Sequence, residues 1–173
     1  MKRIVTPLTK HSIADLKAGE EVLLTGTVYT ARDQAHLRMC KMLDKGETLP
    51  VDIKGQIIYY CGPTPAGGRT IGACGPTTSS RMDTFTEPFL KSGLSGMIGK
   101  GARSNEVRKA IERYRAIYFL APGGAATYLS KKVRSCELAG FDDLGPEAIY
   151  KLYVEDFPLI VGIDSKGKDV YSS

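Results

Sequence analysis

Strand-like and helix-like segments alternate through most of this chain, and this alternation limits the fold more than any other feature. Residues 21–30, EVLLTGTVYT, are rich in β-branched and apolar side chains and predict a strand. Residues 32–46 then carry apolar side chains at helical spacing, until Gly46 ends the pattern. Because the order of strand, loop and helix recurs downstream, we predict an α/β fold with a mainly parallel central sheet.

The other predicted elements extend this scheme to the end of the chain. Strands are expected within 55–61, 69–74, 93–101, the first part of 116–133, and 153–171, the last interrupted by turns at 156–158 and 164–167. Helices are expected within 78–90, 104–116 and the last part of 116–133. The additional short strands predict a second β layer or an antiparallel addition to the sheet. We therefore expect a single three-layer domain over residues 1–173.

Composition places the chain among ordinary globular proteins. Hydrophobic residues make up 42% and charged residues 25% of the 173 residues. No apolar run approaches the roughly 20 residues that cross a bilayer, and the N-terminus lacks the apolar segment of a secretory signal. We expect a cytoplasmic protein that is not bound to a membrane. The four cysteines include no CxxC pair, so we expect most of them to be reduced and buried rather than joined in a disulfide framework.

The net charge of +5 raises the question of a nucleic-acid partner. The basic residues are spread through the chain, however, and aromatic residues are not interleaved with them as a stacking platform requires. We therefore expect no nucleic-acid binding. Two other interpretations stay open: a generally basic solvated surface, or a few cations that converge on a small anionic substrate.

Cations or glycine-rich loops follow four of the predicted strands. Arg32 follows the first strand, Thr77 and Arg81 lie in the loop CGPTTSSRMD, Lys100 lies in IGKG, and the fourth loop is APGG. Since loops at the carboxyl ends of parallel strands build the site of such sheets, these residues are candidates to meet. Guanidinium and ammonium groups at three strand ends suit a dicarboxylate. The alternative for any one of them is a solvated side chain.

The tetrapeptide CGPT occurs twice, starting at Cys61 and again at Cys74. Only the second copy leads into hydroxyl residues at a predicted helix start, where free main-chain N–H groups favour an anion. A zinc site or an iron–sulfur cluster within the chain is the competing interpretation. It is disfavoured because zinc sites use closely spaced ligand pairs, and the chain has only two histidines, His11 and His36.

Four segments together resemble a known family. YCGPTPA, GACGPTTSSRMD, GMIGKG and DFPLIVGIDSKG, in this order and spacing, are similar to the β subunit of iron–sulfur-dependent hydro-lyases, in particular two-subunit class I fumarate hydratase and its sister L-tartrate dehydratase. The resemblance covers nearly the whole chain. It implies a swivelling β/β/α domain that works with an α subunit, with two α and two β subunits in the complex. It also implies that the catalytic 4Fe-4S cluster is bound by the α subunit, so that no cysteine of this chain is a cluster ligand.

The resemblance further implies roles for four residues. Arg32, Arg81 and Lys100 would bind the substrate carboxylates, and Thr77 would occupy the position of the catalytic base. The implied reaction is the reversible hydration of fumarate to L-malate in the tricarboxylic acid cycle. A β subunit of L-tartrate dehydratase is the closest alternative, and a non-catalytic dicarboxylate-binding module is the alternative from another class.

Overall fold

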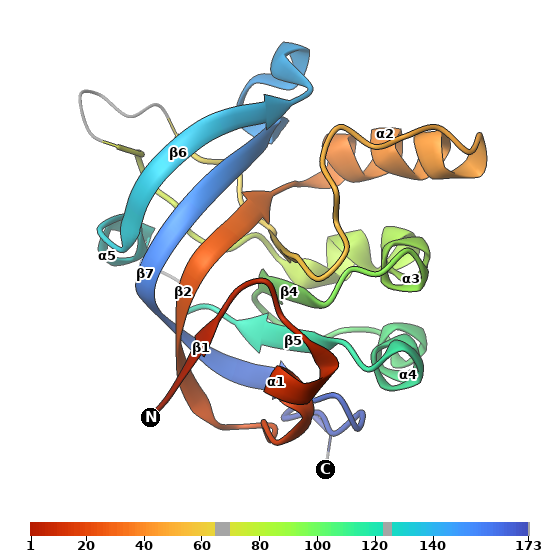
Figure 1. Ribbon diagram of the computed structural model, residues 1–173, viewed down its shortest axis with the longest axis vertical. Coiled ribbons are helices and arrows are strands. Elements are labelled where there is room, and N and C mark those ends of the chain that lie inside the picture. Colours follow the sequence, from red (N-terminus) through yellow and green to blue (C-terminus); the bar gives the residue numbers. More distant parts are fainter. Residues whose placement is uncertain (65–69, 123–125, 173) are drawn as a thin grey trace.

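The computed structural model describes residues 1–64, 70–122 and 126–172 (Figure 1). Its strands are β1 (Lys2–Val5), β2 (Glu21–Thr30), β3 (Ile57–Tyr59), β4 (Gly96–Gly99), β5 (Ile117–Leu120), β6 (Val133–Gly140) and β7 (Ile149–Ile163). Its α-helices are α1 (Lys10–Ala14), α2 (Asp33–Asp44), α3 (Asp83–Lys91), α4 (Asn105–Tyr114) and α5 (Ala126–Ser130). Two 3₁₀ segments, η1 (Ser79–Met82) and η2 (Asp142–Glu147), precede α3 and β7.

The strands form one mixed sheet of seven in the order β1-β2-β3-β4-β5-β7-β6. Strands β1 to β5 pair in parallel, whereas β7 runs antiparallel to β2, β5 and β6. Because β7 also pairs with β2, the path β2-β3-β4-β5-β7 returns to its starting strand. The α/β class and the antiparallel addition are therefore confirmed, and the sheet as a whole is mixed.

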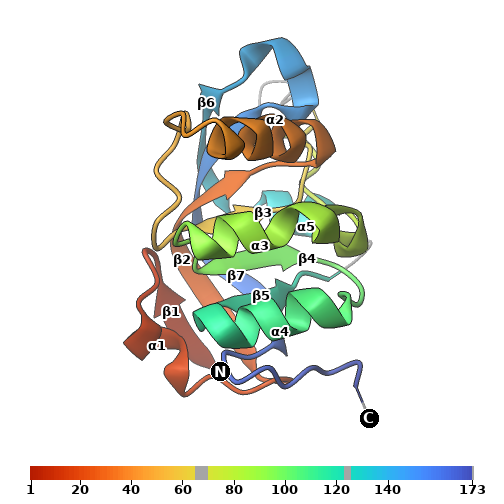
Figure 2. The same ribbon diagram turned by 90° about the vertical axis from the view of Figure 1, so that its right-hand side faces the viewer.

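Helices α2, α3 and α4 lie side by side along one face of the parallel strands (Figure 2). The long curved strands β2, β6 and β7 lie on the opposite side of β4 and β5 (Figure 1). This arrangement creates two hydrophobic cores. One lies between the curved strands and strands β3, β4 and β5, and the other lies between β3, β4 and β5 and the helices.

The period-two alternation of a strand assigns neighbouring residues to the two cores. In β3 and the residue after it, Ile57 and Tyr59 pack in the first core, whereas Ile58 and Tyr60 pack in the second. All four are buried. This explains why the central strands read as continuous apolar runs, since both faces are covered.

Several predicted elements agree with the structure. The strand predicted over residues 21–30 is β2 (Glu21–Thr30), and the following helix ends at Asp44, close to Gly46. The Ser104 side chain caps α4 by accepting from the Val107 N–H at 3.2 Å. The turn at 164–167 is also present, closed by a hydrogen bond from Gly167 N to Asp164 O.

Other predictions were wrong or incomplete. The described part of the predicted strand 69–74 is irregular, because Cys74 donates its N–H to Ala126 in α5 and its carbonyl accepts from the Tyr59 hydroxyl, so neither group joins a strand ladder. The predicted turn at 156–158 is instead a positive-φ residue, Asp156, within the continuous strand β7. The short elements β1 and α1 and the strand β6 were not predicted. The predicted loops PAGG and APGG lie largely outside the described residues.

In the described parts of the chain, no helix combines the length and apolarity needed to span a bilayer.

Candidate active site

The carboxyl ends of the parallel strands meet at one edge of the sheet. Thr30 at the end of β2 pairs with Tyr59 at the end of β3, and Gly99 at the end of β4 pairs with Leu120 at the end of β5. Tyr59 also pairs with Ile98, so the four ends are in register. The segments that follow these strands therefore begin side by side, as the sequence predicted for the candidate residues.

Thr77 and Lys100 are placed at this edge by main-chain hydrogen bonds. Thr77 donates its N–H to the carbonyl of Tyr60, 2.7 Å away, directly beyond β3. The next residue, Thr78, forms an isolated parallel bridge with Lys100, and Ser79 donates to the Lys100 carbonyl at 2.9 Å. The second CGPT segment thus crosses the ends of β3 and β4. It leaves Thr77 half-buried and Lys100 exposed.

These hydrogen bonds correct one expectation about anion binding. The predicted helix start begins with the 3₁₀ segment η1, and its N-cap Thr78 makes no side-chain capping hydrogen bond. Because the N–H groups of Thr77 and Ser79 are already bound to carbonyl oxygens, they are not free for an anion. These two N–H groups therefore cannot bind a negative ligand at this edge, whereas side-chain cations can.

Arg81 is joined to the start of α2 by an ion pair with Asp33. Since Asp33 directly follows Arg32, this contact brings two of the three candidate cations to adjacent segments of the chain. The N–H of Ala31 donates to the carbonyl of Tyr59 at 3.1 Å, which holds the end of β2 beside β3. Sequence reasoning missed Asp33, and no pattern in the sequence marked it as the partner of Arg81.

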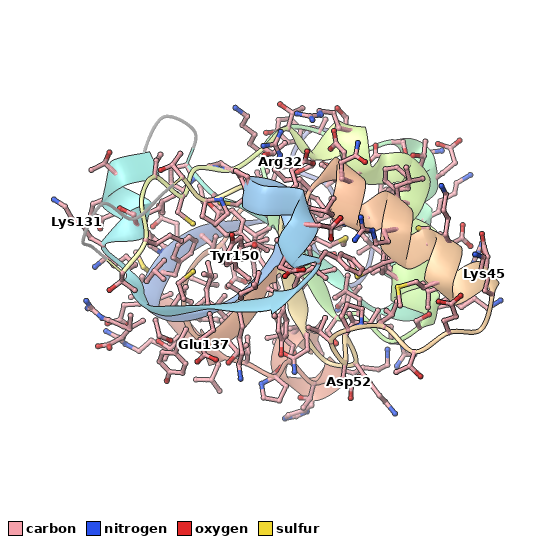
Figure 3. The ribbon with its side chains drawn as sticks, turned by 90° about the horizontal axis from the view of Figure 1, so that it is seen from above. Arg32, Lys45, Asp52, Lys131, Glu137 and Tyr150 are labelled. Atoms are coloured by element: carbon pink, nitrogen blue, oxygen red, sulfur yellow. The ribbon has the colours of Figure 1, made fainter. Side chains whose placement is uncertain are left out.

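Arg32 lies in a narrow space between two segments. A Cβ atom built on Gly62 would lie 2.9 Å from both Cδ and Nη1 of Arg32 and 3.2 Å from the carbonyl of Pro146. Glycine at position 62 therefore makes room for the guanidinium. Figure 3 shows Arg32 beside η2, and the Nε of Arg32 is buried without a hydrogen-bond partner among the described residues. A buried unpaired donor is costly, and an anionic ligand would satisfy it.

The side chain of His36 is hydrogen-bonded to the main chain of Arg32. The imidazole is buried, and its Nδ1 lies 2.7 Å from the carbonyl oxygen of Arg32, which can only accept. Burial lowers the pKa of His36 to about 4, so the ring is neutral near pH 7 and Nδ1 carries the proton. His36 entered the sequence analysis only as a possible metal ligand, because the aromatic rings of Tyr60, Phe85 and Phe89 that surround it are distant in the chain.

The two CGPT segments lie against each other through their cysteines. The sulfur atoms of Cys61 and Cys74 are 3.4 Å apart, and both thiols are free and buried. The hydrogen bond to Cys74 and burial raise the pKa of the Cys61 thiol well above its ordinary value. The prediction of buried cysteines is confirmed for this pair, and their reduced state stays a prediction. The expectation that both segments follow strands is wrong, since only Cys61 follows one.

In the described part of this chain, the cysteines and other ligand-type residues do not have the arrangement that the iron–sulfur cluster implied by the resemblance would need. Within residues 1–64, 70–122 and 126–172, no three or more His, Cys, Asp and Glu side chains gather as a metal site would require. Cys40 lies outside the paired thiols, in the helix α2. The described residues therefore do not fit a 4Fe-4S cluster, which needs three or four converging thiolates.

A second group of charged residues lies directly beneath the edge. Arg103 is buried and pairs with Asp83, and the Tyr118 hydroxyl donates to the carbonyl of Gly101 and is hydrogen-bonded to the hydroxyl of Ser79. Sequence reasoning did not identify these residues, because Asp83 and Arg103 are 20 residues apart and neither has a distinctive local pattern.

Comparison with known proteins relates this chain to hydro-lyases. A family model described as "Fumarase C-terminus" matches residues 2–173. The Methanocaldococcus jannaschii protein named "Putative L(+)-tartrate dehydratase subunit beta" is 42% identical, over 99% of this chain and 91% of that protein. "Fumarate hydratase 2" of Leishmania major is 39% identical over 94% of this chain, and "Fumarate hydratase class I, aerobic" of Escherichia coli is 37% identical over 99% of it.

The relatives differ in how much of their length this chain spans. It spans nine tenths of the archaeal subunit but only 29% and 31% of the two fumarate hydratases. The matched region is thus a separate subunit in one relative and a part of a longer protein in the others. Because the family model and these relatives cover nearly the whole chain, the protein belongs to the fumarase C-terminal family of fumarate and tartrate hydro-lyases.

Proposed function

We propose that this chain is the β subunit of an iron–sulfur-dependent hydro-lyase that reversibly hydrates fumarate to L-malate. The observation that supports this most directly is the convergence of Thr77, Arg32, Arg81 and Lys100 on segments at one edge of the sheet. In this proposal the chain is one swivelling β/β/α domain that is active only with an α subunit, in a complex of two α and two β subunits. The 4Fe-4S cluster belongs to the α subunit, where an open iron would act as a Lewis acid on the substrate hydroxyl.

The three cations of this chain have the chemistry that a dicarboxylate needs. Arg32 and Arg81 offer planar forks that bind carboxylates through two hydrogen bonds, and Lys100 adds a compact positive charge. The buried Nε of Arg32, which has no hydrogen-bond partner among the described residues, favours binding of an anion at this position. Fixed cations also stabilise the negative charge that develops on the substrate when a proton leaves its carbon.

Thr77 is the candidate for the proton transfer. Its main-chain N–H donates to the carbonyl of Tyr60 at 2.7 Å, and this hydrogen bond fixes the main chain of Thr77 next to the segment of Lys100. A threonine hydroxyl is a weak base in water, and it can accept a proton from carbon only where nearby positive charge stabilises its alkoxide. Arg81 and Lys100 are the sources of that charge in this proposal.

L-tartrate dehydration is the second candidate reaction. It is favoured by one observation, the 42% identity with a protein named as a tartrate dehydratase subunit whose length this chain nearly matches. L-tartrate and L-malate are both four-carbon dicarboxylates that carry a hydroxyl next to a carboxylate. The three cations suit both substrates, and discrimination between them would depend on contacts to the second hydroxyl of tartrate.

The test is an anaerobic reconstitution of this chain with its candidate iron–sulfur partner. Fumarate hydration is followed by loss of fumarate absorbance, with L-tartrate turnover measured in parallel, for the chain alone and for the mixture. We expect activity only in the mixture, and a loss of roughly a hundredfold or more in Thr77→Ala and Arg81→Ala. The matched controls are Thr84→Ala and Arg113→Ala, which change exposed residues of α3 and α4.

The outcomes separate the candidates. Turnover of L-tartrate without turnover of fumarate would assign the chain to the sister enzyme. A reconstituted complex with intact cluster that transforms neither substrate would refute the hydro-lyase proposal. Binding of malate by the chain alone would then favour a non-catalytic dicarboxylate-binding module.

A further inference from the structure

A buried arginine connects several of the elements that carry the candidate site. The Arg103 side chain has 0% exposure, and its Nε donates to Asp83 Oδ1 at 2.6 Å. Its Nη2 donates to the hydroxyl oxygens of Tyr60 and Thr86 at 3.1 and 2.9 Å. Its guanidinium carbon also lies 4.8 Å from the ring centroid of Tyr118, within range of a cation–π contact. One side chain therefore contacts residues from α3, the β3 end and β5.

Asp83 extends this contact to α4. Its second oxygen, Oδ2, accepts the N–H of Ser104 at 2.7 Å, so the carboxylate joins the start of α3 to the residue that caps α4. Asp83 also follows Arg81 by only two positions. The position of the η1 segment, which carries Arg81, is thereby tied to the buried guanidinium.

Tyr118 extends the contact to the loops of Thr77 and Lys100. Its hydroxyl lies 2.8 Å from the carbonyl of Gly101 and 2.7 Å from Ser79 Oγ. Burial raises the pKa of Tyr118, so the phenol stays protonated and donates to Gly101, while Ser79 donates to the phenol oxygen. Because the Ser79 N–H also binds the Lys100 carbonyl, this one hydroxyl fixes both segments.

We propose that Arg103, Asp83 and Tyr118 form a positioning unit that sets Thr77, Arg81 and Lys100 for the proposed reaction without touching the substrate. The inference rests on the proposed function. It is supported by two series of contacts that start at the buried guanidinium. One leads to Tyr60, whose carbonyl accepts from the Thr77 N–H, and the other leads through Tyr118 to the loop of Lys100.

The chemistry of the cluster favours positioning over simple stabilisation. A buried charge pair carries a large desolvation cost and is often no more stabilising than apolar residues of similar volume. A charged and fully hydrogen-bonded cluster does restrict orientation, because each donor and acceptor has a fixed direction. Small displacements of reacting groups reduce turnover strongly, so orientation is what a site at loop ends needs most.

The test uses Tyr118→Phe, which keeps the buried ring and removes only the hydroxyl. The reconstituted complex is assayed well below its melting temperature, and kcat and KM are determined separately. We expect kcat/KM to fall roughly tenfold or more. In the full chain, hydrogen exchange at the Ser79 amide should become faster. Tyr114→Phe, at the far end of α4, is the matched control, with wild-type kcat/KM and exchange.

Arg103→Lys is the second variant, because removing the charge altogether leaves Asp83 buried without its partner and endangers folding. Lysine keeps the charge but cannot reach Asp83, Tyr60 and Thr86 together, so we expect a loss of kcat/KM similar to that of Tyr118→Phe. A folded Tyr118→Phe variant with wild-type kcat/KM and wild-type exchange at Ser79 would overturn the proposal. If the wild-type complex transforms neither substrate, the proposed function fails, and exchange at Ser79 still decides whether the unit holds these loops.

Discussion

Acid should destabilise this protein through His36, and a single substitution can isolate the effect. The ring is buried among Tyr60, Phe85 and Phe89, and its Nδ1 donates to the Arg32 carbonyl. Burial, the largest cause, lowers its pKa from 6.5 to about 4, and the nearby positive charge of Arg103 acts in the same direction. We expect His36→Gln, which cannot take up the proton, to remove this part of the pH dependence.

The expected magnitude follows from the two pKa values. Above pH 6.5 the histidine is neutral in both the folded and the unfolded chain, and the stability is fully retained. Between pH 6.5 and about 4 only the unfolded chain binds the proton, so the free energy of unfolding falls as the pH falls. At about 1.4 kcal/mol for each pKa unit, the loss reaches about 3 kcal/mol at the acid limit and about 1.4 kcal/mol at pH 5.5.

The assay is urea unfolding at pH 7.5 and 5.5, for wild type and His36→Gln. With a denaturant slope of about 2 kcal/mol per molar urea, the wild-type midpoint should fall about 0.7 M further than that of the variant. The control is His11→Gln at an exposed position, which should behave as wild type. Equal pH dependence of wild type and His36→Gln would refute the reasoning, because it would mean that His36 takes up its proton in the folded protein.

Three further predictions concern the candidate site. Gly99→Ala should lower the free energy of unfolding by about 1–3 kcal/mol in urea titrations, because the added Cβ would lie 1.9 Å from the hydroxyl oxygen of Ser79. Wild-type stability of this variant would contradict the close packing at Gly99. Asp33→Asn should change the free energy of unfolding by less than about 1 kcal/mol, since the ion pair with Arg81 is partly exposed. It should raise the KM of the reconstituted complex, because Arg81 loses its partner. An unchanged KM would count against this role. Cys61→Ser combined with Cys74→Ser should leave the iron content of the complex unchanged, whereas a proportional loss of iron would make these thiols cluster ligands.

The sequence was most informative where local chemistry decides the structure. The strand Glu21–Thr30 and the helix α4 follow from β-branched runs, helical spacing and the Ser104 cap, which act over a few residues. The same local signals located the loops of Arg32 and Lys100 after their strands. The strand β6 escaped prediction because its exposed and half-buried positions show no clear alternation of apolar residues.

The tertiary structure decided which of these residues meet and what supports them. Sequence spacing does not predict that Asp33 pairs with Arg81 or that Arg32 packs against Gly62. It also does not predict that Arg103 is buried. Each of these contacts joins segments from different elements. The irregular path through Cys74 has the same origin, because its polar groups are satisfied by α5 and a tyrosine rather than by a neighbouring strand. Local preference determined the elements of this protein, and long-range burial and hydrogen bonding determined the arrangement of its candidate site.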